Sequence, residues 1–269
     1  MALMDIGFFS ESLGMAVHCM ALLPHAREGE TLPKRQTLYL LHGYGDSYTS
    51  WIRKTNLERY AAHHNLAVIM PDAQKSAYTD MTHGGKFFTY IADELPSKMR
   101  AFLPLSERRE DTFISGFSMG GYGAFKIGLA RPMQYAAIGC ISAGVSNDTP
   151  DTVALRELRT GGRPLKDTEE DVPASIARAA ALGKDAPRIY HTIGQEDSLL
   201  SSARETRDLL HSYPGDPFHY MKKSPANTAG NSVMARCAIF CNGSLQHPAE
   251  TRCLRAQFCS RLRHNLQLA

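Results

Sequence analysis

The 269-residue chain lacks the features of several large protein classes. No hydrophobic run approaches the roughly 20 apolar residues that a membrane-spanning helix needs. The first 26 residues contain no Lys or Arg, so the positively charged start of a secretory signal is missing. Apolar residues make up 43% and charged residues 21%, an ordinary globular composition that excludes disordered, collagen-like and coiled-coil chains. These absences predict a cytoplasmic protein that does not cross a membrane.

Cysteine and basic charge are scarce in most of the chain and concentrate near its C-terminus. Two cysteines precede residue 224 and four follow it: Cys19 and Cys140, then Cys237, Cys241, Cys253 and Cys259. The formal net charge is +3, but residues 224–269 contain five Arg, no Lys and one acid, so the preceding residues sum to −1. A disulfide scaffold and a nucleic-acid partner are therefore disfavoured. The distal cysteines match no common zinc-ligand spacing, so we expect no metal.

Short apolar runs alternate with longer amphipathic stretches. The apolar runs predict buried strands at Thr37–Leu41, Ala67–Met70, Thr112–Ser115, Ala136–Ile141 and Arg188–Ile193. The amphipathic stretches predict helices at Asn56–His64, Gly85–Phe102, Gly121–Ala130 and Leu199–His211. This alternation indicates an α/β fold, a mostly parallel sheet with helices on both faces. The opening segment, Ala2–Pro24, predicts an antiparallel hairpin at one edge of the sheet.

One polar stretch, Ser146–Pro187, interrupts this alternation. It contains Gly161-Gly162, four Pro and two short helical patterns, near Val153–Leu158 and Ala174–Leu182. It is either an insertion over the sheet or an irregular crossover between two strands. An insertion at the carboxyl ends of the strands would cover a ligand site.

The strongest motif is Gly116-Phe117-Ser118-Met119-Gly120, which lies between a predicted strand and a predicted helix. This G-x-S-x-G pattern in this context is typical of a nucleophile elbow. The turn forces the serine into a strained backbone conformation, and side chains at the two flanking glycine positions would collide. The amides at the start of the helix favour negative charge developing near the serine oxygen. We therefore expect Ser118 to be a catalytic nucleophile.

A glycine-rich loop, Leu40–Gly45, follows another predicted strand. Acyl transfer needs two backbone N–H groups aimed at the tetrahedral oxyanion. We expect one from Met119 and the other from Tyr44, and we expect His42 to orient the loop rather than act as a base. The alternative for the loop is a tight strand–helix turn.

The sequence Gly194-Gln195-Glu196-Asp197 follows the strand at Arg188–Ile193. This position places Asp197 at a carboxyl end of the sheet, where it can orient a histidine. Glu196 competes for the same role, although the register favours Asp197. His191 lies inside the strand and is expected to be a core or surface residue.

The chain resembles the α/β-hydrolase esterases of the tributyrin esterase and S-formylglutathione hydrolase (esterase D) family. The resemblance extends from Phe8-Phe9-Ser10 to about Lys223. It includes His42-Gly43, Met70-Pro71-Asp72, Tyr78-Thr79-Asp80, the elbow and Gly194–Asp197. It implies hydrolysis of short acyl esters or thioesters without a cofactor, and a cap formed by residues 146–187. Trp51 and Tyr78 either border the acyl pocket or pack in the core, and packing is favoured.

The general base is missing from its expected place. The family carries a histidine in a pattern close to P-G-x-H-x-W, after a last strand that corresponds to Phe218–Lys222. Here Thr228 occupies the histidine position and Gly230 the tryptophan position. His219 is the remaining candidate near the predicted site, whereas His247 and His264 lie in the distal tail.

Our hypothesis for this departure is a shift of the reading frame near Lys223–Ser224. If one base was lost there, the original codon at the position of Thr228 encoded either tyrosine or histidine. With permitted synonymous codons, the segment in the original frame reads P-G-Q-H-S-W and then an amphipathic helix. We therefore expect an α/β-hydrolase domain at residues 1–223 and an aberrant tail at residues 224–269.

The expected function is that of a serine hydrolase that cleaves small acyl esters or thioesters through an acyl-enzyme. A catalytically impaired pseudoenzyme without the base is one alternative, and an acyltransferase on the same fold is another. A homo-oligomer is compatible with the sequence, which does not fix the oligomeric state.

Overall fold

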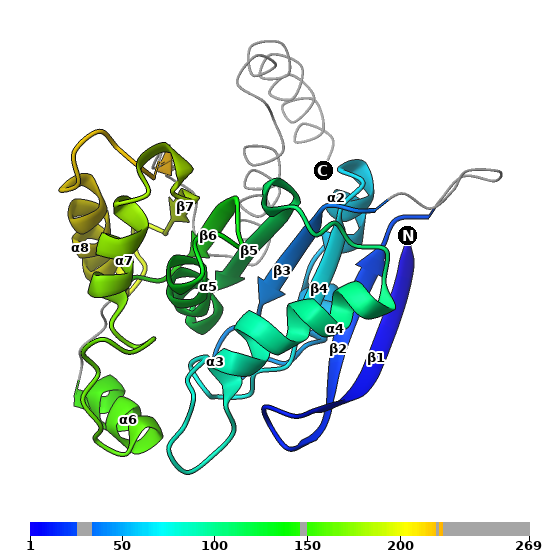
Figure 1. Cartoon of the computed structure of the whole chain (residues 1–269), viewed down its shortest axis with the longest axis horizontal. Helices are drawn as coiled ribbons and strands as arrows, with labels where there is room; N and C mark the ends of the chain where they lie inside the picture. The colour runs from blue at the N-terminus through cyan, green and yellow to red at the C-terminus, as the bar shows by residue number, and fades with distance from the viewer. Residues whose placement is uncertain (26–33, 146–149, 219–220, 223–269) are drawn as a thin grey trace.

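The computed structural model describes residues 1–25, 34–145, 150–218 and 221–222. In this part of the chain, eight strands form one sheet in the order β1-β2-β4-β3-β5-β6-β7-β8 (Figure 1). Strand β2 runs antiparallel to both of its neighbours, β1 and β4. Every other pair of adjacent strands in the sheet is parallel. The predicted α/β architecture and its antiparallel edge hairpin are confirmed.

The strands follow the apolar runs closely. They are β1 (Ala2–Ser10), β2 (Met15–Leu23), β3 (Thr37–Leu41), β4 (Ala67–Pro71), β5 (Thr112–Phe117), β6 (Ala137–Ile141), β7 (Arg188–Thr192) and β8 (Met221–Lys222). The five buried strands predicted from the sequence agree with β3 to β7 to within two residues at each end. Of the predicted last strand, residues 219–220 lie outside the described part of the chain.

Helices connect these strands. They are α1 (Ser50–Lys54), α2 (Leu57–His63), α3 (Phe87–Thr89), α4 (Leu95–Phe102), α5 (Met119–Ala130), α6 (Pro150–Thr160), α7 (Val172–Ala180) and α8 (Leu200–His211). Short 3₁₀ turns occur at Arg109–Asp111 and Gly183–Asp185, and a π-helical turn at Tyr90–Glu94 joins α3 to α4.

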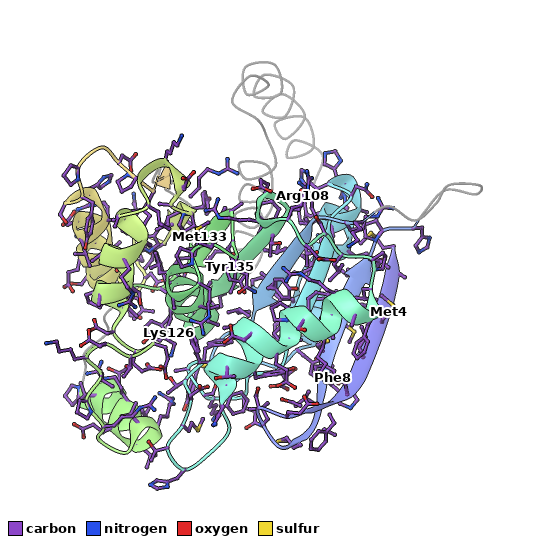
Figure 2. All side chains as sticks on the ribbon, viewed as in Figure 1. Met4, Phe8, Arg108, Lys126, Met133 and Tyr135 are labelled. Carbon is purple, nitrogen blue, oxygen red and sulfur yellow. The ribbon has the colours of Figure 1, made fainter. Side chains whose placement is uncertain are left out.

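The sheet separates two apolar cores. On one face, β3 contributes Tyr39 and Leu41 to a core that includes residues of α4, α5 and α7. On the other face, Leu38 and Leu40 pack with residues of α1 and α2. This alternation follows from the period-2 orientation of side chains along a strand. At the edge of the sheet, the Phe8 ring on β1 contacts the Phe102 ring of α4 with 6.1 Å between centroids (Figure 2).

The sequence predicts one helix over Gly85–Phe102, whereas the structure contains a π-helical turn within it. The cause is Pro96, which cannot donate a hydrogen bond to the carbonyl of Ala92 and would clash with it in a regular α-helix. The wider turn instead pairs the Leu95 N–H with the Tyr90 carbonyl. The Ala92 carbonyl accepts a hydrogen bond from the Gln134 side chain at 3.1 Å.

The segment between β6 and β7 divides into two different parts. Helix α7 buries Val172, Ile176 and Ala179 in the first core and packs against α5. Helix α6 instead exposes Leu158 to 76% and lies beyond the end of the sheet to which β3 points (Figure 1). The segment therefore combines a packed crossover helix with a projecting one.

A single carboxylate fixes the turn between β1 and β2. The Glu94 side chain accepts hydrogen bonds from Ser10 Oγ at 2.7 Å, from the Glu11 N–H at 2.8 Å and from the Ser12 N–H at 3.0 Å. Burial opposes the charged form, but these hydrogen bonds outweigh it and lower the pKa of Glu94 from 4.5 to about 2. The charged carboxylate therefore stabilises the folded state.

We predict that Glu94→Gln lowers the free energy of unfolding by about 1–2 kcal/mol at pH 7, after allowance for partial solvent screening. Because the folded pKa lies below the unfolded one, the contribution of Glu94 is complete above about pH 4.5 and is lost as the pH falls towards 2. Urea unfolding of parent and variant from pH 7 to pH 3 measures this difference, which should shrink on acidification. Glu11→Gln is the control, and an equal loss there would contradict the assignment.

Candidate active site

Ser118 lies at the sharp turn between β5 and α5. Its backbone has φ 54° and ψ −120°, a conformation that residues with a Cβ rarely adopt. Its N–H donates to the Ile141 carbonyl of β6 at 2.9 Å, and its carbonyl accepts the N–H of Tyr122 at 3.0 Å. The turn is therefore held from the neighbouring strand and from its own helix. Ser118 is half-buried, and its side chain makes no capping hydrogen bond to α5.

The glycines on either side of Ser118 are sterically required. A Cβ on Gly116 would lie 2.3 Å from the Gly120 carbonyl oxygen, and a Cβ on Gly120 would lie 2.4 Å from the Leu41 carbonyl oxygen. Both distances are far inside van der Waals contact. The predicted need for glycine at these positions is confirmed, and the second contact brings the loop after β3 directly against the elbow.

Helix α5 begins at Met119, directly after the serine. The Met119 N–H is one of the first four amides of the helix, which have no partner within it. The helix dipole places partial positive charge at this end. Ser118 thus lies where an oxyanion is electrostatically favoured.

His42 stabilises the loop after β3 through hydrogen bonds of both ring nitrogens. Its Nε2 accepts the Ala73 N–H at 2.9 Å, which requires an unprotonated nitrogen, so Nδ1 carries the proton and donates to the Gly43 carbonyl at 2.9 Å. The ring is 1% exposed. These contacts agree with the prediction that His42 orients the loop.

Trp51 and Tyr78 support the same loop from inside the protein. The Trp51 indole N–H donates to the Leu41 carbonyl at 3.1 Å, and the Tyr78 hydroxyl donates to the His42 carbonyl at 2.8 Å. Both side chains are buried. The expectation that they pack is confirmed. Tyr44 instead points outwards, with its ring 51% exposed and the Lys75 ammonium 5.1 Å from its centroid.

Asp197 lies in the turn between β7 and α8, at the same carboxyl edge of the sheet as Ser118. It is half-buried, and its Oδ1 accepts the Leu199 N–H at 3.0 Å. Glu196 is exposed. The segment that follows the intervening strand β6 contacts α8, because the Val145 N–H donates to Thr206 Oγ1 at 2.9 Å. His191 lies buried on β7, where its Nε2 is 2.7 Å from the Ala143 carbonyl, so it is a core residue.

The candidate base His219 lies outside the described residues, as do Thr228, which occupies the family's histidine position, and the whole of the tail at residues 224–269. The structure therefore brings together the serine, the loop after β3 and the start of α5, and it places Asp197 at the same edge.

A buried ion pair that the sequence does not predict lies beside this site. Lys126 Nζ lies 2.7 Å from Glu170 Oε1, with side-chain exposures of 0% and 2%. Burial lowers the pKa of Lys126, while the charge of Glu170 acts against this shift. One signal was available: Lys126 is the only charged residue in the apolar stretch Met119–Ala130. Its partner lies 44 residues away and cannot be chosen from sequence.

Two kinds of feature are absent from the described residues. None of their helices is both long enough and apolar enough to span a membrane. Among the same residues, no group of three or more His, Cys, Asp or Glu side chains is arranged to hold a metal ion.

Comparisons with known proteins agree with this geometry. An acetyl esterase of Caldicellulosiruptor saccharolyticus is 29% identical over 230 residues, which cover 78% of this chain and 85% of that protein. The substrate-bound structure of FphF, a fluorophosphonate-binding serine hydrolase of Staphylococcus aureus, matches with a TM-score of 0.80 and 27% identity, over 91% of this chain and 99% of that one. The S-formylglutathione hydrolase FrmB of the same organism matches with a TM-score of 0.76 and 28% identity, over the same shares.

These similarities support the α/β-hydrolase fold and a hydrolase that acts on esters. The Esterase family matches residues 10–215, a region that contains Ser118, Asp197 and the loop after β3. The chain belongs to the Esterase family.

Proposed function

We propose that the chain is a serine hydrolase that cleaves short-chain acyl esters or thioesters through an acyl-enzyme on Ser118. The observation that carries the proposal is the strained backbone of Ser118 at a strand–helix turn flanked by two glycines that nothing larger can replace. Such strain persists where the surroundings over-determine it, and it is concentrated at active sites. The similarity to an acetyl esterase and to an S-formylglutathione hydrolase supports both substrate classes.

The chemistry assigns one role to each group. A base removes the Ser118 proton as Oγ forms a bond to the acyl carbon, and the N–H groups of Tyr44 and Met119 donate to the resulting oxyanion. The C–O or C–S bond then breaks, and the protonated base returns the proton to the leaving alcohol or thiol. Water repeats these steps and releases the carboxylic acid. Asp197 orients the base and stabilises its charged form. No step needs a cofactor.

The residue found at the family's histidine position favours a second candidate. With Thr228 there, a chain without another competent base is a catalytically impaired pseudoenzyme that retains the serine and its pocket. The two candidates differ in the reactivity of Ser118.

The proposed partner is a small acyl ester or thioester. Cys19 and Cys140 are buried free thiols, which supports a reducing, cytoplasmic location because oxidising compartments favour disulfides.

A fluorophosphonate probe should label the parent chain and fail to label Ser118→Ala. The probe forms a covalent bond to an activated serine, so labelling also reports a competent base. The exposed Ser201→Ala variant is the matched control and should label as the parent does. A folded parent that does not label would support the pseudoenzyme, and labelling that survives Ser118→Ala would place the nucleophile elsewhere.

Substitution of each candidate acid should show whether Asp197 or Glu196 orients the base. In a turnover-competent chain, we expect Asp197→Asn to lower kcat for p-nitrophenyl acetate by about 10⁴-fold, because the base loses its orienting partner. Glu196→Gln should change kcat less than about twofold, since the charge of an exposed side chain is screened by solvent. The reverse pattern would assign the role to Glu196.

A version of the chain with the reread ending tests the missing base. We expect it to hydrolyse a p-nitrophenyl acyl ladder faster than the chain as written, by up to about 10⁶-fold, the loss that removal of a triad member causes. Sequencing the gene across Lys222–Ala229 checks the cause directly, because codons incompatible with the reread string exclude a frameshift. Equal rates, together with loss of activity in His219→Gln, would make His219 the base.

A further inference from the structure

The ammonium group of Lys126 is buried and has a hydrogen-bond acceptor for each of its protons. Nζ contacts Glu170 Oε1 at 2.7 Å, the Ala77 carbonyl at 3.0 Å and Thr79 Oγ1 at 3.0 Å. These three acceptors match the three protons of a lysine ammonium. The charge is therefore desolvated but completely hydrogen-bonded, the arrangement that makes a buried ion pair tolerable.

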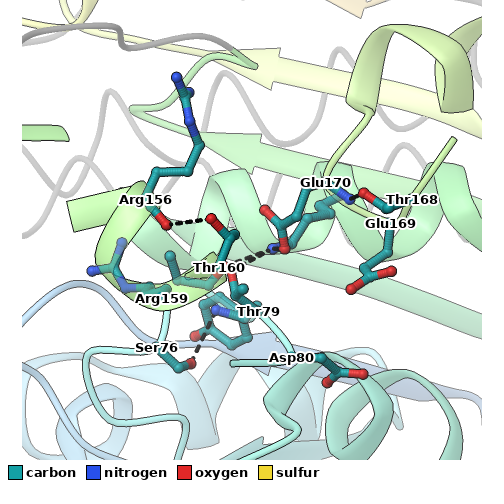
Figure 3. Close-up of polar contacts among 12 residues, drawn as sticks. Ser76, Thr79, Asp80, Arg156, Arg159, Thr160, Thr168, Glu169 and Glu170 are labelled. Atoms are coloured by element: carbon teal, nitrogen blue, oxygen red, sulfur yellow. Dashed lines mark hydrogen bonds and ion pairs between the residues drawn. The ribbon is translucent and has the colours of Figure 1, made fainter. Parts of the chain in front are cut away.

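The three acceptors come from two segments of the chain that are both distant from Lys126 in the sequence. Lys126 lies on α5 (Figure 2), the helix that begins after Ser118. Glu170 directly precedes Asp171, the residue that caps α7 by accepting the Ala174 N–H. Ala77 and Thr79 belong to the loop after β4. Figure 3 places Thr79 and Asp80 of this loop beside Thr160 and Glu170 of the segment between β6 and β7.

The loop after β4 leads back to the oxyanion side of the site. Ala77 and Tyr78 both have positive φ, 51° and 55°, so external contacts must hold this turn. The Tyr78 ring packs against α5 so closely that a Cβ on Gly123 would lie 2.3 Å from it. The Tyr78 hydroxyl donates to the His42 carbonyl, next to Gly43 and Tyr44. Lys126 therefore holds the residue that supports the predicted oxyanion loop.

Tyr122 connects the ion pair to the serine along α5. It lies four residues after Ser118 and four before Lys126, so the three share one face of the helix. Its N–H donates to the Ser118 carbonyl, and Lys126 Nζ lies 5.2 Å from the centroid of its ring. Burial, followed by the charge of Glu170, raises the pKa of Tyr122 and keeps its hydroxyl neutral.

We propose that Lys126 and Glu170 are positioning residues for the esterase site. Their ion pair holds the loop after β4 and the start of α7 against the nucleophile helix. Through Tyr78 it thereby fixes the loop at His42–Tyr44, and through α5 it fixes the turn in which the Tyr122 N–H donates to the Ser118 carbonyl. The proposal rests on the proposed function of Ser118, and it assigns to this pair the geometry of the site rather than a contact with the reacting atoms.

The kinetic test compares single and paired substitutions. Glu170→Gln and Lys126→Met each remove one charge, whereas Lys126→Met together with Glu170→Leu replaces the pair by apolar groups, which proteins often tolerate without loss of stability. Steady-state kinetics with p-nitrophenyl acetate, butyrate and octanoate should show kcat lowered at least about tenfold in Glu170→Gln and in the double variant, because small misplacements of reacting groups are costly. The ratio of kcat/KM between acetate and octanoate should also shift.

Glu169→Gln is the matched control. Glu169 is the neighbouring carboxylate, and it pairs with Arg163 at 2.9 Å in a partly exposed position. This variant should stay within about twofold of the parent for every ester. A double variant that unfolds at the parent's temperature and keeps the parent's kinetics across the ladder would overturn the proposal, because the pair would then act on stability alone.

Hydrogen exchange separates failure of this proposal from failure of the proposed function. In Glu170→Gln, amides of residues 73–80 and of residues 161–171 should both exchange faster than in the parent. Glu169 reaches this loop only through Arg163, which donates to the Asp80 carbonyl, so Glu169→Gln should leave residues 73–79 unchanged. If the parent hydrolyses none of the esters, the esterase proposal fails. Hydrogen exchange alone then shows whether the ion pair holds the loop after β4. Unchanged exchange at residues 73–80 would then overturn it.

Discussion

The backbone of Ser118 can keep its strained conformation only because three strands and one helix meet there without side chains between them. Strain of this kind costs on the order of 1–3 kcal/mol and must be held by the surrounding structure. Here β6 accepts the Ser118 N–H, α5 returns a hydrogen bond through Tyr122, and the loop after β3 lies against Gly120. These contacts require β3 and β6 to lie on either side of β5, as the strand order has them.

Polar groups buried behind the serine are arranged to prevent relaxation of the turn. His42 has both ring nitrogens engaged, Tyr78 donates to the loop after β3, and Lys126 has three acceptors. In a low-dielectric interior, each such bond is directional and its loss is costly, so a fully satisfied network specifies one geometry. Preorganised N–H groups need this rigidity, because an oxyanion hole works only when its donors do not have to reorganise during the reaction.

The sequence predicts those parts of the molecule that local pattern controls. The apolar runs locate β3 to β7, and the G-x-S-x-G motif between a strand and a helix locates the elbow. The π-helical turn was missed because it arises from Pro96 within an otherwise regular pattern, and Gln134 compensates for it from a distant position. Helix α1 has five residues, too few for a period of 3.6 to be visible. The pairing of Lys126 with Glu170 depends on how α7 packs on α5, which no local pattern contains.

The two halves of the proposed site place different demands on the sequence. The nucleophile half depends on a costly backbone conformation, two irreplaceable glycines and a buried ion pair, and all of these lie within the region that matches the Esterase family. The base half depends on a single histidine after the last strand, where the sequence has Thr228. A chain that never needed an activated serine would gain stability by relaxing this strain, since proteins maintain strained sites at a cost to stability. The strain at Ser118 is therefore what the proposed catalytic serine requires, and the departure at Thr228 concerns the base half of the site alone.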